Sequence, residues 1–155
     1  LGNYILGGST LSSRLGNRIR QKEGLSYGVS SSVSIPSRGN DSRFTITAIT
    51  NPDNMDAVEA AAIEELTRFI NEGPTDTEVA DAQKAWLERQ KVSRSSDRSI
   101  AGSMISNLEF GRTFDYTKSR ETNIAELTPE NIQTAFKKHI DPSQLVIIRA
   151  GDFQK

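Results

Sequence analysis

The feature that most constrains the fold is a pair of alternating segments in the first third of the chain. Between residues 25 and 35, one parity carries Tyr, Val, Ser, Val and Ile, and the other carries only Ser and Gly from Ser26 onward. Residues 43–48 alternate too, with Phe44, Ile46 and Ala48 on one side. Such a period of two predicts strands. Residues 36–41 between them contain Pro, Ser, Gly, Asn and Asp, which favour turns. We therefore predict an antiparallel hairpin.

Helical periodicity dominates the rest of the chain. Leu11, Leu15 and Ile19 recur every four residues, which predicts an amphipathic helix ending near Gly24. Thr75-x-x-Glu78 is a capping box that predicts the start of another helix. The remaining helices are expected over residues 53–72, 75–94, 100–111, 115–126 (weakly) and 129–140. The first three have apolar positions with helical spacing, which predicts that one face of each is buried. These positions are Met55, Val58, Ala62, Leu66, Phe69 and Ile70 in the first helix, Val79, Ala82, Trp86 and Leu87 in the second, and Ile100, Met104, Ile105 and Leu108 in the third.

Two short apolar runs lie near the ends of the sequence. Residues 4–6 precede a Gly-Gly pair and are interpreted as the end of a strand. Residues 145–148 are apolar at every position, which predicts a central strand. The expected order is β-α-β-β-α-α-α-α-α-β. This order favours an α+β fold, with a mainly antiparallel sheet and helices packed on one face, in a single domain over residues 1–155.

Composition excludes several classes of function. The chain has 155 residues, a formal net charge of −1 and no cysteine. Its charge gives no general attraction for nucleic acid, so no nucleic-acid partner is expected. No apolar run is long enough to predict a membrane span. The sequence begins at Leu1 rather than methionine, so we expect a fragment of a longer two-domain protein. The compartment stays open between a bacterial periplasm and a cytoplasm.

The most informative motif is the segment GGSTLSSRLGNRIRQKEGLSYG over residues 7–28. Within it, Arg20, Lys22, Glu23, Leu25 and Tyr27 match an Arg-x-Lys-Glu-x-Leu-x-Tyr pattern. The segment resembles the C-terminal, non-zinc-binding domain of the M16 metallopeptidases, the pitrilysin and insulinase-like family. The order of predicted elements also suits that domain. The resemblance implies that Arg20 and Tyr27 reach towards the zinc site of a partner domain.

The spacing of this pair also has a physical interpretation. Arg20 falls in the last turn of a predicted helix, and Tyr27 starts the following strand, with Gly24 between them. Guanidinium and phenol are both hydrogen-bond donors, and two donors can hold a substrate carbonyl or stabilise an oxyanion. Plainer roles stay open as well. The arginine could simply interact with the helix dipole, and the tyrosine could belong to the core or its rim.

Zinc chemistry in this family requires ligands that the sequence lacks. The zinc site uses His-x-x-Glu-His plus a distant Glu, with the motif Glu activating water. The chain has one histidine, His139, in the sequence Lys-Lys-His-Ile-Asp. We therefore predict no catalytic residue, no metal and no cofactor in this chain. Zinc is expected in the partner, an N-terminal domain of the HxxEH type or a homologous subunit.

The function expected from this resemblance is to close a peptide-binding chamber and to position the peptide substrate, without proteolysis by this chain alone. The first alternative is a structural subunit of the same fold family that assembles without proteolytic activity. The second alternative is a module that binds extended peptides along an open sheet edge. The sequence itself does not identify the substrate.

Overall fold

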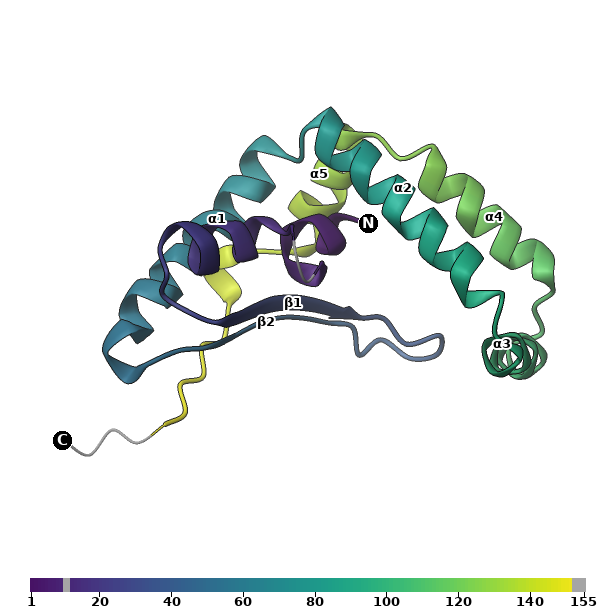
Figure 1. Ribbon diagram of the computed structural model, residues 1–155, viewed down its shortest axis with the longest axis horizontal. Helices are drawn as coiled ribbons and strands as arrows, with labels where there is room; N and C mark the ends of the chain where they lie inside the picture. Colours follow the sequence, from purple (N-terminus) through teal and green to yellow (C-terminus); the bar gives the residue numbers. More distant parts are fainter. Residues whose placement is uncertain (10–11, 152–155) are drawn as a thin grey trace. The chain divides into compact units, whose positions relative to one another are not determined.

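The computed structural model describes residues 1–9 and 12–151. The chain divides into two compact units (Figure 1). The sheet unit comprises Gly2–Pro74 together with Pro129–Lys155, and the helical unit comprises Leu1 with Thr75–Thr128. The organisation of the whole chain as one domain stays a prediction.

The predicted hairpin is confirmed in the sheet unit. Strand β1 (Gly28–Ser34) pairs antiparallel with β2 (Arg43–Ile49), in a register that sets Gly28 opposite Ile49 and Ser34 opposite Arg43. Ser31 is buried and stands opposite Ile46 on the inward face. Side chains alternate along each strand, but on β1 the apolar parity is covered only at Val29 and Ser31, whereas Val33 is 44% exposed.

The expected strand at Tyr4–Leu6 is wrong. These residues belong to η1 (Tyr4–Gly8), a π-helical turn that packs against β1. Ile5 and Leu6 are buried. An apolar run of three residues fits a buried helical turn as well as a buried strand, so periodicity alone could not decide between them.

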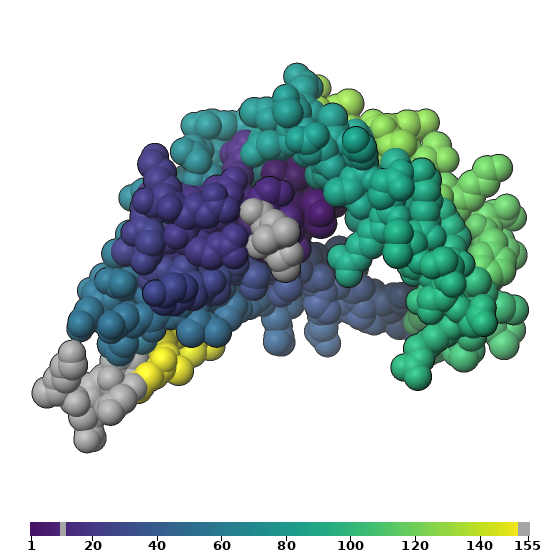
Figure 2. Space-filling model, viewed as in Figure 1, coloured from purple at the N-terminus to yellow at the C-terminus, as the bar shows by residue number. Residues whose placement is uncertain are grey.

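The predicted helix before Gly24 is confirmed, in a shorter and wider form. Helical backbone begins at Arg14 and continues as η2 (Gly16–Lys22), and Ser13 Oγ accepts a hydrogen bond from Gly16 N at 3.2 Å. Leu15 and Ile19 are fully buried, as their spacing predicts, whereas Leu11 lies outside the described residues. The η2 turn packs on the long helix formed by residues 55–72 (Figure 2).

Gly7 lies where no side chain fits. A Cβ atom at this position would meet Ser31 N at 2.6 Å, Ser31 Oγ at 2.5 Å and Leu15 Cδ1 at 2.8 Å. The glycine therefore allows η1 to approach the backbone of β1.

Replacing Gly7 with alanine is expected to lower the free energy of unfolding by about 1–3 kcal/mol, because backbone atoms must move to admit the methyl group. Thermal or urea unfolding measures this change. Gly28→Ala is the matched control, since a Cβ there meets nothing within 4 Å. Equal stability of the two variants would contradict the packing described here.

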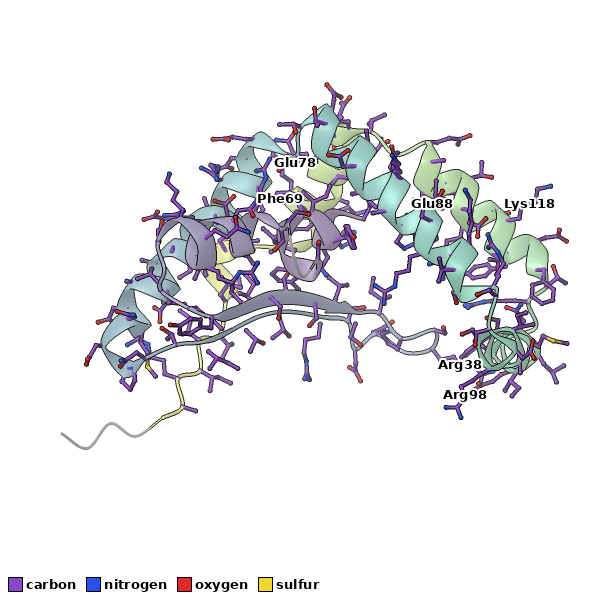
Figure 3. The ribbon with its side chains drawn as sticks, in the orientation of Figure 1. Arg38, Phe69, Glu78, Glu88, Arg98 and Lys118 are labelled. Atoms are coloured by element: carbon purple, nitrogen blue, oxygen red, sulfur yellow. The ribbon has the colours of Figure 1, made fainter. Side chains whose placement is uncertain are left out.

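Two helices complete the core of the sheet unit. Helix α1 (Met55–Glu72) follows the short helical turn η3 (Pro52–Asn54). Helix α5 (Pro129–His139) packs against α1. Phe69, labelled in Figure 3, is fully buried on α1, with its ring centroid 4.7 Å from that of Phe136. Gly73 has φ of 74° and ends α1, as predicted.

The expected central strand at 145–148 is also wrong. After α5, the short helical turn η4 (Pro142–Gln144) leads into residues that form no strand and pair with no other strand among those described. Val146 and Ile148 are 86% and 85% exposed. An all-apolar run predicts burial, but a strand also needs hydrogen bonds to a neighbouring strand, and these residues pair with neither β1 nor β2.

The helical unit contains α2 (Asp76–Ser93), α3 (Asp97–Glu109) and α4 (Phe114–Ala125). The Thr75–Glu78 capping box is confirmed in both directions. Val79 and Ala82 are buried as predicted, but α3 differs from its prediction because its apolar side chains are exposed. These exposed residues are Ile100, Met104, Ile105 and Leu108.

The fold class is therefore α+β, as predicted, although only two antiparallel strands form and both terminal strands of the expected order are absent from the described residues. Among those residues, every helix is too short or too polar to cross a lipid bilayer.

Candidate functional site

The site is a short segment of the sheet unit that joins η2 to β1. Its turn is built around Gly24, whose φ of 64° favours glycine. Two backbone hydrogen bonds close the turn: Glu23 N donates to Arg18 O at 3.0 Å, and Leu25 N donates to Ile19 O at 2.9 Å. These bonds hold the end of η2 and the residues that lead into β1 in one closed turn.

Tyr27 stands immediately before β1 with its side chain in solvent. It is 98% exposed, so the structure rules out a core role in the described chain. Its backbone neighbours are fixed: Ser26 Oγ donates to Ile49 O at 2.7 Å, and Thr50 Oγ1 donates to Leu25 O at 2.5 Å. A fully exposed phenol thus projects from an anchored stretch of backbone.

Arg20 lies in the last turn of η2 and is half-buried. Within residues 1–9 and 12–151, its guanidinium forms no hydrogen bond, ion pair or ring contact, and none joins it to Tyr27. The structure therefore places the predicted pair on the two sides of one turn, with both sets of donors available. It does not bring the two side chains into direct contact.

Arg18 is a residue of this segment that the sequence reasoning missed. Its Nε donates to Glu23 Oε1 at 3.0 Å, and its Nη2 donates to Glu64 Oε2 at 2.5 Å. The hydrogen bond with Glu64 raises the pKa of Arg18, and partial burial acts in the opposite direction. The available signal was Glu65, an acidic residue placed one turn from Ala61 and from Phe69 on the buried stripe of α1.

The described residues include no group that fits a zinc site. His139 is exposed at the C-terminal end of α5, beside Lys137 and Lys138. In the described part of the chain, no three His, Cys, Asp or Glu side chains converge closely enough to hold a metal ion. A catalytic zinc needs at least three such ligands.

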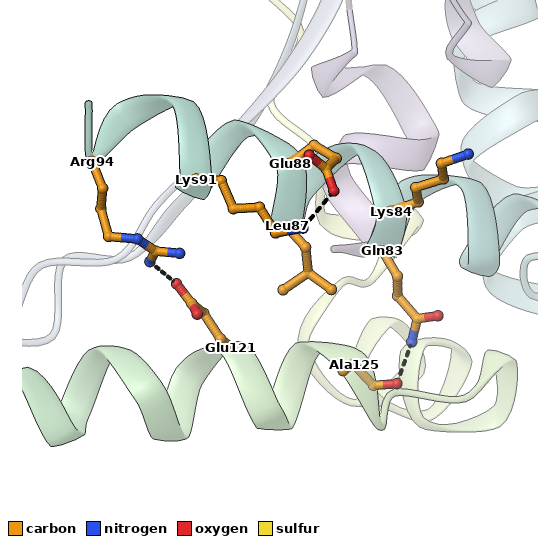
Figure 4. Close-up of a pocket in the computed structure, with 8 residues that line it drawn as sticks. All are labelled: Gln83, Lys84, Leu87, Glu88, Lys91, Arg94, Glu121 and Ala125. Atoms are coloured by element: carbon orange, nitrogen blue, oxygen red, sulfur yellow. Dashed lines mark hydrogen bonds and ion pairs between the residues drawn. The ribbon is translucent and has the colours of Figure 1, made fainter. Parts of the chain in front are cut away.

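A concave region lies within the helical unit, between α2 and α4 (Figure 4). Its volume is about 420 Å³. Four of the five charged side chains that line it are paired: Lys91 Nζ donates to Glu88 Oε1 at 2.7 Å, and Arg94 pairs with Glu121. The bond from Lys91 lowers the pKa of Glu88, which keeps that carboxylate ionised and unsuited to act as a general acid at neutral pH. The Arg20–Tyr27 segment is therefore the better candidate site.

Solved structures that resemble this one include the following three. A peptidase M16 inactive domain from Pseudomonas fluorescens is 28% identical, with a TM-score of 0.79 over 91% of this chain and 33% of its own. A protease from Helicobacter pylori is 16% identical, with a TM-score of 0.78 over 92% of this chain and 34% of its own. The periplasmic protease PqqL from Escherichia coli is 22% identical, with a TM-score of 0.67 over 80% of this chain and 14% of its own.

The last two similarities concern the fold alone, because their sequence identities are low. The chain spans about a third or less of the length of these proteins. Comparison with curated protein sequences gave no significant match. The family model of the peptidase M16 inactive domain matches residues 1–85, which include both strands, α1 and the whole Arg20–Tyr27 segment. The chain therefore belongs to the peptidase M16 inactive-domain family.

Proposed function

We propose that this chain is the non-catalytic half of a zinc metallopeptidase, in which it closes the peptide-binding chamber and binds the substrate through Arg20 and Tyr27. The observation that carries the proposal is the state of Tyr27. Its phenol is fully exposed although the two residues before it, Leu25 and Ser26, are hydrogen-bonded to Thr50 and Ile49 at the end of β2. A donor that is free in solvent but fixed at its backbone is suited to bind a ligand.

The chemistry of the pair supports a role at a peptide carbonyl. A guanidinium offers several N–H donors in a planar fork, and a phenol offers one O–H donor. Donors directed at a carbonyl oxygen hold the substrate backbone, and they bind more strongly as negative charge develops on that oxygen. Arg20 also brings a positive charge that no acidic side chain neutralises by an ion pair in the described residues.

The metal and the general base belong to another polypeptide segment in this proposal. No group of side chains among the described residues fits a zinc site, so no catalytic step is assigned to a metal held here. A domain or subunit with the His-x-x-Glu-His motif would supply the zinc ligands and the Glu that activates water. This chain would supply substrate binding and charge stabilisation.

Metal analysis combined with a cleavage assay tests the proposal. The isolated chain is expected to contain no stoichiometric zinc and to leave an internally quenched peptide uncleaved, because it lacks the required ligands. Adding the HxxEH-type partner should produce cleavage that depends on the presence of both components. One tightly bound zinc per isolated chain would contradict the assignment.

One observation favours a second candidate function, that of a structural subunit. Several large apolar side chains are exposed, including Ile105 and Leu108 on α3. Exposed apolar surface of this kind is typical of protein–protein contacts. The HxxEH motif distinguishes the two candidates: a partner that carries the motif favours the peptidase, and a permanent partner that lacks it favours assembly alone.

A further inference from the structure

Arg18 occupies an unusual position two residues before Arg20. Its guanidinium lies near three carboxylates: Nε is 3.0 Å from Glu23 Oε1, Nη2 is 2.5 Å from Glu64 Oε2, and Nη1 is 3.8 Å from an oxygen of Glu65. Glu23 belongs to the same turn, whereas Glu64 and Glu65 belong to α1. One side chain therefore joins the candidate site to the longest helix of the sheet unit.

The Glu65 side chain shows that this junction is not simply a surface ion pair. Glu65 is fully buried, and its Oε2 lies 2.5 Å from Arg68 Nη2. Its Oε1 has no hydrogen-bond partner in the described structure. A buried carboxylate with an unsatisfied oxygen is costly, and well-packed apolar residues often replace such groups without loss of stability. The arrangement is therefore better explained by the geometry that it imposes than by its contribution to stability.

That geometry includes Arg20 and Tyr27. The backbone oxygen of Arg18 accepts from Glu23 N, and the guanidinium of Arg18 binds the side chain of the same glutamate. The oxygen of Ile19 accepts from Leu25 N, so residues 18–25, which comprise the end of η2 and the Gly24 turn, form one hydrogen-bonded loop. Arg20 lies within this loop, and Tyr27 follows it by two residues.

We propose that Arg18 is a positioning residue, which fixes the loop on Glu64 and Glu65 of α1 and so sets the placement of Arg20 relative to Tyr27. The proposal rests on the function proposed above. Arg18 does not touch the substrate, because its donors are already engaged by carboxylates. It acts through Arg20, which is free to bind.

A double-mutant cycle in the full-length protein with its zinc-bearing partner tests this mechanism. Arg18→Met is expected to lower kcat/KM by about tenfold, mainly through kcat, because small displacements of binding groups strongly reduce turnover. In an Arg20→Ala background, Arg18→Met should change kcat/KM by less than about twofold, because residues that act as a unit are not additive. Arg18→Lys, which retains a charge for one carboxylate, should recover part of the rate.

The matched control is Arg149→Met. Arg149 also bridges two carboxylates of α1, with Nη1 2.8 Å from Asp56 Oδ1 and Nη2 2.7 Å from Glu59 Oε2, but it lies outside the loop. It should leave kcat/KM within about twofold of the wild type, since it removes a comparable exposed ion pair. Glu64→Gln is the milder second variant, in case Arg18→Met fails to fold. It removes a charge from an exposed carboxylate and should reproduce the direction of the Arg18 effect.

Amide hydrogen exchange supplies a readout that does not depend on activity. Arg18→Met should increase exchange at Leu25 and Glu23 in the full-length protein, and Arg149→Met should not. Unchanged exchange, or additive effects of Arg18→Met and Arg20→Ala on kcat/KM, would overturn the positioning role. If Arg20→Ala itself has no effect while exchange rises as expected, the proposed function fails and the local ordering by Arg18 stands.

Discussion

Tyr27→Phe in the complete peptidase is expected to lower kcat by about one to three orders of magnitude, because the variant removes one donor to the developing oxyanion. The substitution removes only the phenolic oxygen. The side chain is 98% exposed and contributes little packing, so the melting temperature should stay unchanged. Steady-state kinetics with an internally quenched peptide, together with a thermal melt, measure both quantities.

Tyr116→Phe is the matched control for this substitution. Tyr116 lies on α4 in the helical unit, where its ring stacks under the guanidinium of Arg112 at 4.3 Å. Loss of its hydroxyl should not affect kcat, because it is not in the candidate site. An unchanged kcat in Tyr27→Phe would remove Tyr27 from the mechanism, whatever its position in the family motif.

The largest effect on stability is expected from Phe69→Ala. Phe69 is fully buried on α1, in an edge-to-face contact with Phe136 and with the Arg14 guanidinium 5.0 Å from its ring centroid. Truncation of a buried phenylalanine leaves a cavity and typically costs about 3–5 kcal/mol. Urea unfolding followed by circular dichroism should show a midpoint shifted to lower denaturant concentration with little change in slope.

Phe114→Ala provides the comparison within the same chain. Phe114 is exposed in the first turn of α4, so its loss should change the free energy of unfolding by less than about 1 kcal/mol. If Phe69→Ala were no more destabilising than Phe114→Ala, the core described for the sheet unit would be incorrect.

Elements with local chemical signals were predictable from the sequence. The hairpin follows from alternation on both sides of a Pro-Ser-Arg-Gly-Asn-Asp turn, and its register matches that pattern. The start of α2 follows from the Thr75–Glu78 capping box, and the end of α1 follows from Gly73. These signals depend on contacts within a few residues, which a sequence displays directly.

The conformation of the two terminal apolar runs was not predictable, because it depends on contacts with residues that are distant in the sequence. Residues 4–6 and 145–148 are short apolar runs whose composition indicates burial but not conformation. In the first run, contact with β1 accompanies a helical turn. In the second, the residues pair with neither β1 nor β2, and Arg149 is instead anchored by ion pairs to α1.

The candidate site could be predicted only in part from the sequence. The Arg20…Tyr27 pair is visible in one stretch of sequence, and the structure adds the full exposure of Tyr27 and the anchoring of its neighbours. Glu65 on the buried stripe of α1 signals a basic partner, but the sequence does not identify that partner as Arg18, which lies more than forty residues away along the chain. The role of an arginine that binds α1 emerges only from the tertiary structure.

The central claim is that Tyr27 and Arg20 bind a carbonyl oxygen more strongly when it becomes an oxyanion. The most direct test measures two affinities of the complete peptidase. One is for a phosphinic peptide, which mimics the tetrahedral state, and the other is for the peptide substrate of the same sequence before cleavage. Tyr27→Phe is expected to weaken phosphinic-peptide binding by the same factor that it lowers kcat/KM, with substrate affinity nearly unchanged. Equal affinity of wild type and variant for the phosphinic peptide would contradict the claim.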